Sequence, residues 1–121
     1  YILFLKYDRF LTSNHHNHNA PEPLYEEGNK VVMRCSDCGC VQFTFGTSHF
    51  LLTWDQFLLL DKKLERESVQ IKYPELKCKC FSIPVENHVA RLFLTSKELL
   101  ELQLMIQQAL WMFSVKEILN N

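Results

Sequence analysis

The chain has 121 residues, 47% of them hydrophobic and 22% charged, and this length and composition predict one globular domain with a buried core. Thirteen Lys and Arg against fourteen Asp and Glu give a formal net charge of -1. No overall positive field therefore collects phosphates or anionic lipid, so neither nucleic acid nor a membrane is the expected partner. The apolar run from Ile2 to Leu5 is also far shorter than the roughly 18 residues of a membrane span. We expect a cytoplasmic protein without a transmembrane helix.

The N-terminal quarter is predicted to lie outside the folded domain. Residues 12–28 read TSNHHNHNAPEPLYEEG, and a stretch so poor in apolar side chains cannot offset the entropy lost on ordering, so a linker or long loop is expected. Its clustered histidines could bind a transition metal, but a polar tract is the preferred interpretation. Residues 1–11 are either a docked strand or an upstream extension. Residues 1–29 are thus assigned to an N-terminal segment and linker, and residues 30–121 to a single compact domain.

Three strands and a helix are predicted next along the chain. Residues 31–33 and 41–45 are interpreted as strands that flank a cysteine-bearing turn, because the second alternates apolar and polar side chains. The short apolar run 49–52 follows turn residues and predicts a third strand. The segment Thr53-Trp54-Asp55-Gln56 has the form of a capping box. An amphipathic helix is therefore expected from residue 54 to about residue 67.

A second capping box, Thr95-Ser96-Lys97-Glu98, lies 42 residues after the first and predicts a second helix from Ser96 to Leu119. Several apolar residues of the first unit have an apolar residue 42 positions later in the chain. The coincidence indicates either an internal duplication of a strand-strand-strand-helix unit or two units of like architecture. Two such units side by side would give an α+β two-layer sandwich, with one antiparallel sheet and both helices on one face. Pro84 then belongs at a sheet edge or a bulge.

The second helix carries more apolar residues than one face can hold. Its predicted core stripe consists of Leu99, Leu102, Ile106, Ala109 and Phe113. Five further apolar side chains lie largely off this stripe, namely Leu104, Trp111, Met112, Val115 and Ile118. Either both sides of the helix are buried within the monomer, against the chain's own N-terminal segment, or a second face pairs with another chain. We prefer a homodimer, or a docked protein partner, through this helix.

Residues 34–40 read RCSDCGC and hold the most informative motif of the chain. In Cys35-x-x-Cys38-Gly39 two thiolates can converge on a metal from a tight turn, and the glycine admits the left-handed backbone that such a knuckle needs. A thioredoxin-type redox pair would instead stand at the start of a helix, whereas a strand is expected to follow here. The motif therefore predicts one half of a zinc ribbon.

A structural zinc needs four ligands, and the knuckle supplies two. The remaining thiols predict a four-cysteine site made of Cys35, Cys38, Cys78 and Cys80, with Cys40 as a substitute ligand. The alternative is that no metal binds, because Cys78 and Cys80 would share one side of a strand and could be small hydrophobic side chains facing the core. Five cysteines crowded in this way fit reduced thiols or a metal better than a disulfide scaffold.

No arrangement typical of catalysis is found in the sequence. It holds no Ser, His and Asp set, no glycine-rich phosphate loop and no paired carboxylates on one helix face. We therefore predict a non-enzymatic domain that acts in protein-protein or self-association, with or without a structural zinc. The alternative is a thiol-based redox or metal-handling protein that uses Cys35 and Cys38.

The knuckle Cys35-Ser36-Asp37-Cys38-Gly39 leading into residues 41–45, together with residues 52–57, 82–85 and 98–109, resembles a family of small uncharacterised Bacteroidetes proteins, a domain of unknown function with a Cys-x-x-Cys-Gly knuckle. The resemblance covers residues 30–119. It implies a compact α+β domain, cytoplasmic and without an assigned activity, so it adds no catalytic residue. The pattern of that family includes the first cysteine pair but not Cys78 and Cys80.

Overall fold

The computed structural model describes residues 21–71, 77–79, 81–85 and 90–120. In chain order the elements are β1 (Glu22–Glu27), β2 (Lys30–Arg34), β3 (Val41–Phe45), β4 (Ser48–Leu52), α2 (Trp54–Ser68), β5 (Phe81–Val85), β6 (Ala90–Leu94) and α3 (Ser96–Leu119). Strands β1 to β4 form an antiparallel sheet in that order, and β5 pairs with β6 in a separate two-stranded sheet.

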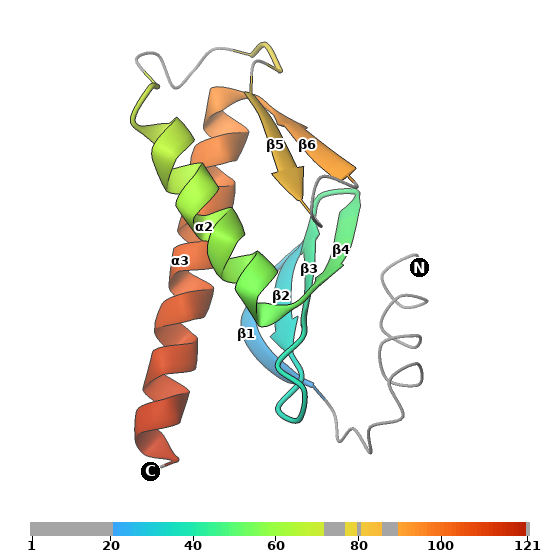
Figure 1. The fold of residues 1–121 in the computed structure, drawn as a ribbon. Coiled ribbons are helices and arrows are strands. Elements are labelled where there is room, and N and C mark those ends of the chain that lie inside the picture. The colour runs from blue at the N-terminus through green and yellow to red at the C-terminus, as the bar shows by residue number, and fades with distance from the viewer. Residues whose placement is uncertain (1–20, 72–76, 80, 86–89, 121) are drawn as a thin grey trace.

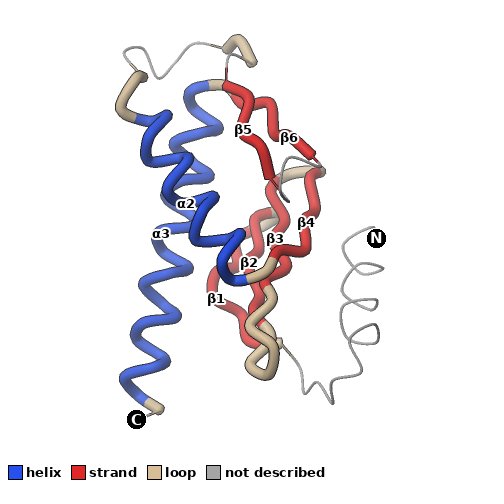
Figure 2. Tube along the Cα trace, in the orientation of Figure 1, coloured by secondary structure: helices blue, strands red, loops and turns tan. Residues whose placement is uncertain are grey.

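The helices form one layer of the molecule and the strands form the other, as Figure 2 shows. Helix α3 packs on β1 and β2, while α2 packs on β4 and β5 and also lies against α3. The predicted α+β class with helices on one side of the strands is therefore confirmed, but the strands form two sheets where one was expected. Figure 1 shows that α3 runs the height of this body and that α2 accompanies only its first part.

The strand β1 corrects the prediction of a linker over residues 12–28, which is wrong for residues 22–27. These residues pair with β2, and Leu24 is buried in the core. The remaining side chains of β1 are mostly polar because the strand lies at a sheet edge, with one face open to water. Gly28, with φ 59°, and Asn29 form the two-residue turn between β1 and β2, a connection that needs positive φ. The folded unit thus begins before residue 30.

Both predicted capping boxes are present and fix where the helices begin. The Thr53 hydroxyl accepts from the Gln56 amide at 3.1 Å, and the Gln56 side chain accepts from the Thr53 amide at 2.9 Å. Thr95 and Glu98 make the same pair of bonds at 3.1 and 2.9 Å. Each box satisfies two amides that a helix start would otherwise leave without a partner. Helix α3 has the predicted bounds, and α2 ends within one residue of its predicted end.

The second half of the described chain is simpler than the first. Residues 77–79, which were expected on a strand, form an irregular bend, and β5 and β6 are the strands described before α3. A repeated three-strand unit is not reproduced in the described ranges, so internal duplication stays a prediction. Pro84 lies in β5, a strand with one unpaired edge, as expected. Within the described ranges, no helix is both long and apolar enough to cross a bilayer.

Candidate functional site

Helix α3 has two apolar faces, and only one of them is covered by the described residues. The inner face packs into the core between α2 and the strands and consists of Leu99, Leu102, Met105, Ile106 and Ala109. The opposite face carries the outer stripe, which we define as Leu100, Leu104, Trp111, Val115 and Ile118. At about 100° of rotation per residue, the outer stripe falls within roughly 60° of arc, directly opposite the core. A helix that turns apolar side chains outward as well as inward is unusual for a surface helix.

The exposure of the outer stripe is large at three of its positions. Leu104 is 54% exposed, Trp111 66% and Ile118 73%. Leu100 is 36% exposed, and Val115 is half-buried. Of the five side chains predicted to lie off the core stripe, Met112 instead packs at the margin of the core. The other four form most of the outer stripe. Burial of both helix faces by the described part of the chain is therefore excluded, whereas the N-terminal segment 1–20 lies outside the described residues.

An aromatic clamp on Arg34 joins the end of β2 to both helices. The Arg34 guanidinium carbon lies 4.8 Å from the ring centroid of Trp54 in α2 and 4.5 Å from that of Phe113 in α3. The two rings themselves lie 4.6 Å apart at 46°. A guanidinium over aromatic faces gains cation-π attraction, and more so where water is excluded. Arg34 thus anchors the strand that leads into the cysteine knuckle.

The knuckle of residues 35–40 is a closed turn built on this anchor. The Cys35 amide donates to the Cys40 carbonyl at 2.9 Å, and the Gly39 amide donates to the Cys35 carbonyl at 2.9 Å. Gly39 has φ 77°, and a Cβ at this position would lie 3.1 Å from Arg34 Nη2. Gly39 is therefore favoured by the left-handed backbone, and a larger residue would also crowd the Arg34 guanidinium.

The thiols of the knuckle differ in accessibility and in chemistry. Cys35 is buried, whereas Cys38 and Cys40 are half-buried, and all three are reduced thiols. Burial raises the pKa of the Cys35 thiol, while hydrogen bonds from the Cys38 and Asp37 amides to its sulfur oppose that rise. The Cys38 thiol also contacts the Cys35 sulfur and raises its pKa further. The thiolate is the form that attacks as a nucleophile and that binds a metal, so the raised pKa of Cys35 disfavours rapid redox exchange and must be overcome by any metal that binds here.

The structure brings Cys35 and Cys38 together but does not bring Cys78 to them. Cys78 is disulfide-bonded, so the expectation of reduced thiols or a metal is wrong for this cysteine. Its neighbour Lys79 lies beside the β3–β4 turn. The knuckle precedes the other end of β3, and five strand residues at roughly 3.3 Å each put roughly 17 Å between the two ends. Cys80 lies outside the described residues, and within the described ranges no three metal-binding side chains form a group. The four-cysteine zinc site therefore stays a prediction.

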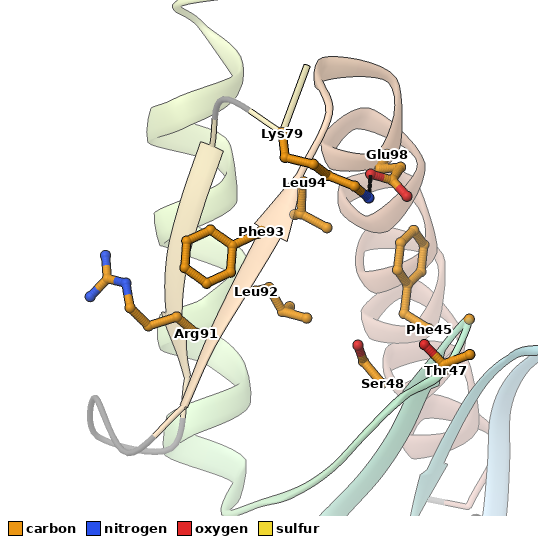
Figure 3. A pocket seen from close by; sticks show the side chains of 10 residues that line it. Phe45, Thr47, Ser48, Lys79, Arg91, Leu92, Phe93, Leu94 and Glu98 are labelled. Atoms are coloured by element: carbon orange, nitrogen blue, oxygen red, sulfur yellow. Dashed lines mark hydrogen bonds and ion pairs between the residues drawn. The ribbon is translucent and has the colours of Figure 1, made fainter. Parts of the chain in front are cut away.

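A cleft of about 440 Å³ lies between the β3–β4 turn, β6 and the start of α3 (Figure 3). The Lys79 ammonium reaches across to the Glu98 carboxylate at 2.5 Å, so the two charges neutralise each other. Burial alone would raise the pKa of Glu98, but hydrogen bonds from Lys79 and Thr95 outweigh it and lower the pKa. Phe93 lies on the wall and is 60% exposed. Sequence reasoning missed this cleft because four separate segments build it.

Comparison of the sequence with protein-family models, with curated proteins and with solved structures finds no match. The resemblance to the Bacteroidetes family therefore stays a prediction. What the protein does has to be inferred from its own residues, and the outer stripe of α3 and the cysteine knuckle are the two features that carry such an inference.

Proposed function

We propose that this protein is a non-enzymatic module that associates with another protein chain through the outer stripe of α3. The observation that carries the proposal is the row of large apolar side chains on the solvent face of α3, opposite a complete core. Single exposed apolar residues are normal on a monomer, but several on one face of one helix are typical of an interaction site. A cytoplasmic location is part of the proposal, since the three reduced thiols of the knuckle suit a reducing compartment, whereas the disulfide of Cys78 suits an oxidising one.

Trp111 is the expected anchor of this interface. It lies near the middle of the outer stripe and is 66% exposed, and its large rigid ring buries much area for little loss of side-chain entropy. Tryptophan is enriched among the interface residues that dominate binding, where truncation costs about 2 kcal/mol or more. A loss of that size weakens a dissociation constant about thirtyfold. The Trp111 ring should therefore decide whether α3 associates.

The test compares two matched substitutions on different helices. Trp111→Glu places a charge in the outer stripe, and Leu59→Glu places the same charge on α2, where Leu59 is also exposed. Sedimentation at micromolar concentration should find an oligomer for the parent and for Leu59→Glu but a monomer for Trp111→Glu. Circular dichroism should find all three folded, because substitution at an exposed site changes stability by about 0.5 kcal/mol or less. A folded parent that sediments as a monomer would contradict the proposal.

A second candidate function is thiol-based metal handling or redox chemistry at the knuckle. It is supported by the contact between the Cys35 and Cys38 thiols and by the amide hydrogen bonds to the Cys35 sulfur, which would stabilise a thiolate toward a soft metal. As a structural zinc, the ion would take these two sulfurs and two further ligands. Elemental analysis together with thiol titration of the native protein distinguishes the cases. Stoichiometric zinc supports the metal, easy formation of a Cys35–Cys38 disulfide supports redox chemistry, and two free thiols without metal contradict both.

A further inference from the structure

The residues of the outer stripe follow one another in a mirror-symmetric order along α3. The midpoint of the order lies between Gln107 and Gln108, both of which are exposed. Leu104 and Trp111 are equally far from this midpoint, and so are Leu100 and Val115. The next pair outward, at the two ends of α3, is Lys97 and Ile118. The four inner apolar positions thus read alike from either end of the helix, whereas Ile118 has the charged Lys97 as its counterpart.

We propose that the partner of α3 is a second copy of this chain, packed antiparallel with the two-fold axis at Gln107 and Gln108. The inference rests on the proposed function and adds the partner and the register to it. In a two-fold symmetric pair of antiparallel helices, residues equally far from the axis meet at the same height. Leu104 of each copy then lies level with Trp111 of the other, and Leu100 with Val115. Four of the five residues of the outer stripe therefore meet an apolar side chain of the other copy, and Ile118 lies level with its Lys97.

The charges at the ends of the stripe favour the antiparallel over the parallel arrangement. In the antiparallel pair each Lys97 lies by the C-terminal end of the other copy's helix, where unpaired carbonyls carry partial negative charge. The two Lys97 ammonium groups then stand about 31 Å apart, at 1.5 Å of rise per residue. A parallel pair would instead put these two cations side by side and align both helix dipoles. The glutamines at the axis are neutral and can hydrogen bond to their own copies.

The contact is long enough for a specific pair of helices. The stripe from Lys97 to Ile118 spans about 32 Å, or about three heptads, and its narrow arc matches the seam of two helices that cross at a small angle. The outer stripe lies opposite the face that packs on α2 and the strands, and Leu104, Trp111 and Ile118 are exposed. The described elements therefore leave this face accessible to a partner helix.

Position-specific cross-linking of the full chain tests the register. Chains that carry Leu100→Cys are mixed with chains that carry Val115→Cys and treated with a short bis-maleimide. Mass spectrometry then identifies the linked peptides and distinguishes them from links between native cysteines. We expect a link between positions 100 and 115 and none between two copies of position 100, which would lie about 22 Å apart. Gln108→Cys, at an exposed site beside the axis, should link to position 108 of the second copy. Leu59→Cys on α2 is the matched control and should give no link.

The outcomes separate this inference from the proposed function. Sedimentation of each sample first establishes whether dimers are present. A monomeric parent overturns both the association and its register. Dimers that link position 100 to position 100 are parallel, and dimers that link neither 100 to 115 nor 108 to 108 use another surface or another register. Either of these results overturns the antiparallel pair while association itself stands.

Discussion

The two faces of α3 carry the same kinds of side chain in different surroundings. Leu102 on the inner face is fully buried, whereas Leu104, two residues later, is 54% exposed. Two residues turn a helix by about 200°, so the contrast comes from position around the axis and not from chemistry. The inner face is held against β1 and β2 by packing and by ion pairs, Lys30 with Glu101 and Lys116 with Glu22. The difference teaches that the stability of the fold and its association can be changed separately within one helix.

The largest expected effect comes from removing the strand that covers the inner face. Deletion of residues 1–28 takes away β1, with the buried side chain of Leu24 and the contacts of Lys116 to Glu22 and to the Pro23 carbonyl. We expect the loss of several kcal/mol, a large part of the 5–15 kcal/mol typical of a small domain, and with it the loss of cooperative thermal unfolding. Calorimetry is the measurement.

The matched control for this deletion is the removal of residues 1–20 only, which leaves β1 in place. This shorter deletion should keep a single cooperative transition. If deletion of residues 1–28 unfolds as cooperatively as the control and at the same Tm, β1 contributes little and the inner face does not need it.

The next largest effect comes from the same Leu→Ala substitution made on each face of α3 in turn. Leu102→Ala opens a cavity in the core and should lower the free energy of unfolding by about 2–5 kcal/mol, whereas Leu104→Ala should change it by about 0.5 kcal/mol or less. In sedimentation, by contrast, Leu104→Ala should weaken the oligomer more than Leu102→Ala does. Urea unfolding and sedimentation of the same samples measure both quantities. Equal loss of stability in the two variants would mean that the outer stripe is part of the core.

Local signals in the sequence predicted the elements that depend on neighbouring residues. The capping boxes at Thr53 and Thr95 predicted both helix starts, since a cap is a contact within four residues. Strand 41–45 was predicted from its alternation. The strand β1 was missed because it is mostly polar, although Gly28-Asn29 is a two-residue hairpin signal that would have indicated it. Whether a polar segment pairs as an edge strand depends on the partner strand, which composition does not describe.

The candidate sites were predictable only in part, for a related reason. The helical period placed Leu104, Trp111 and Ile118 off the core stripe, and they are exposed. The count of cysteines, however, predicted a site that joins the knuckle to Cys78, whose neighbour Lys79 lies beside the β3–β4 turn, at the other end of β3 from the knuckle. The cleft near Glu98 was missed as well. Spacing along the chain predicts local geometry, while the meeting of distant segments depends on topology.

The smallest expected effect is a pH dependence confined to the inner side of the start of α3. The caps of the two helices differ in one respect, because Gln56 is neutral whereas Glu98 is a carboxylate paired with Lys79. The pKa of Glu98 is lowered in the folded state, so its charged form contributes stability that is complete above the unfolded-state pKa of about 4.3. This contribution is lost as the pH falls from there through the lowered folded-state pKa.

Glu98→Gln tests this contribution, because glutamine keeps the capping bond to the Thr95 amide and removes only the charge. The variant should be slightly less stable than the parent at pH 7 and should lose less stability between about pH 5 and pH 3. Chemical unfolding across that range measures the difference. Sedimentation should change equally with pH in both proteins, since the outer stripe holds no carboxylate. If the parent and Glu98→Gln lose the same stability in acid, the ion pair with Lys79 contributes nothing, and both caps of this fold act through their hydrogen bonds alone.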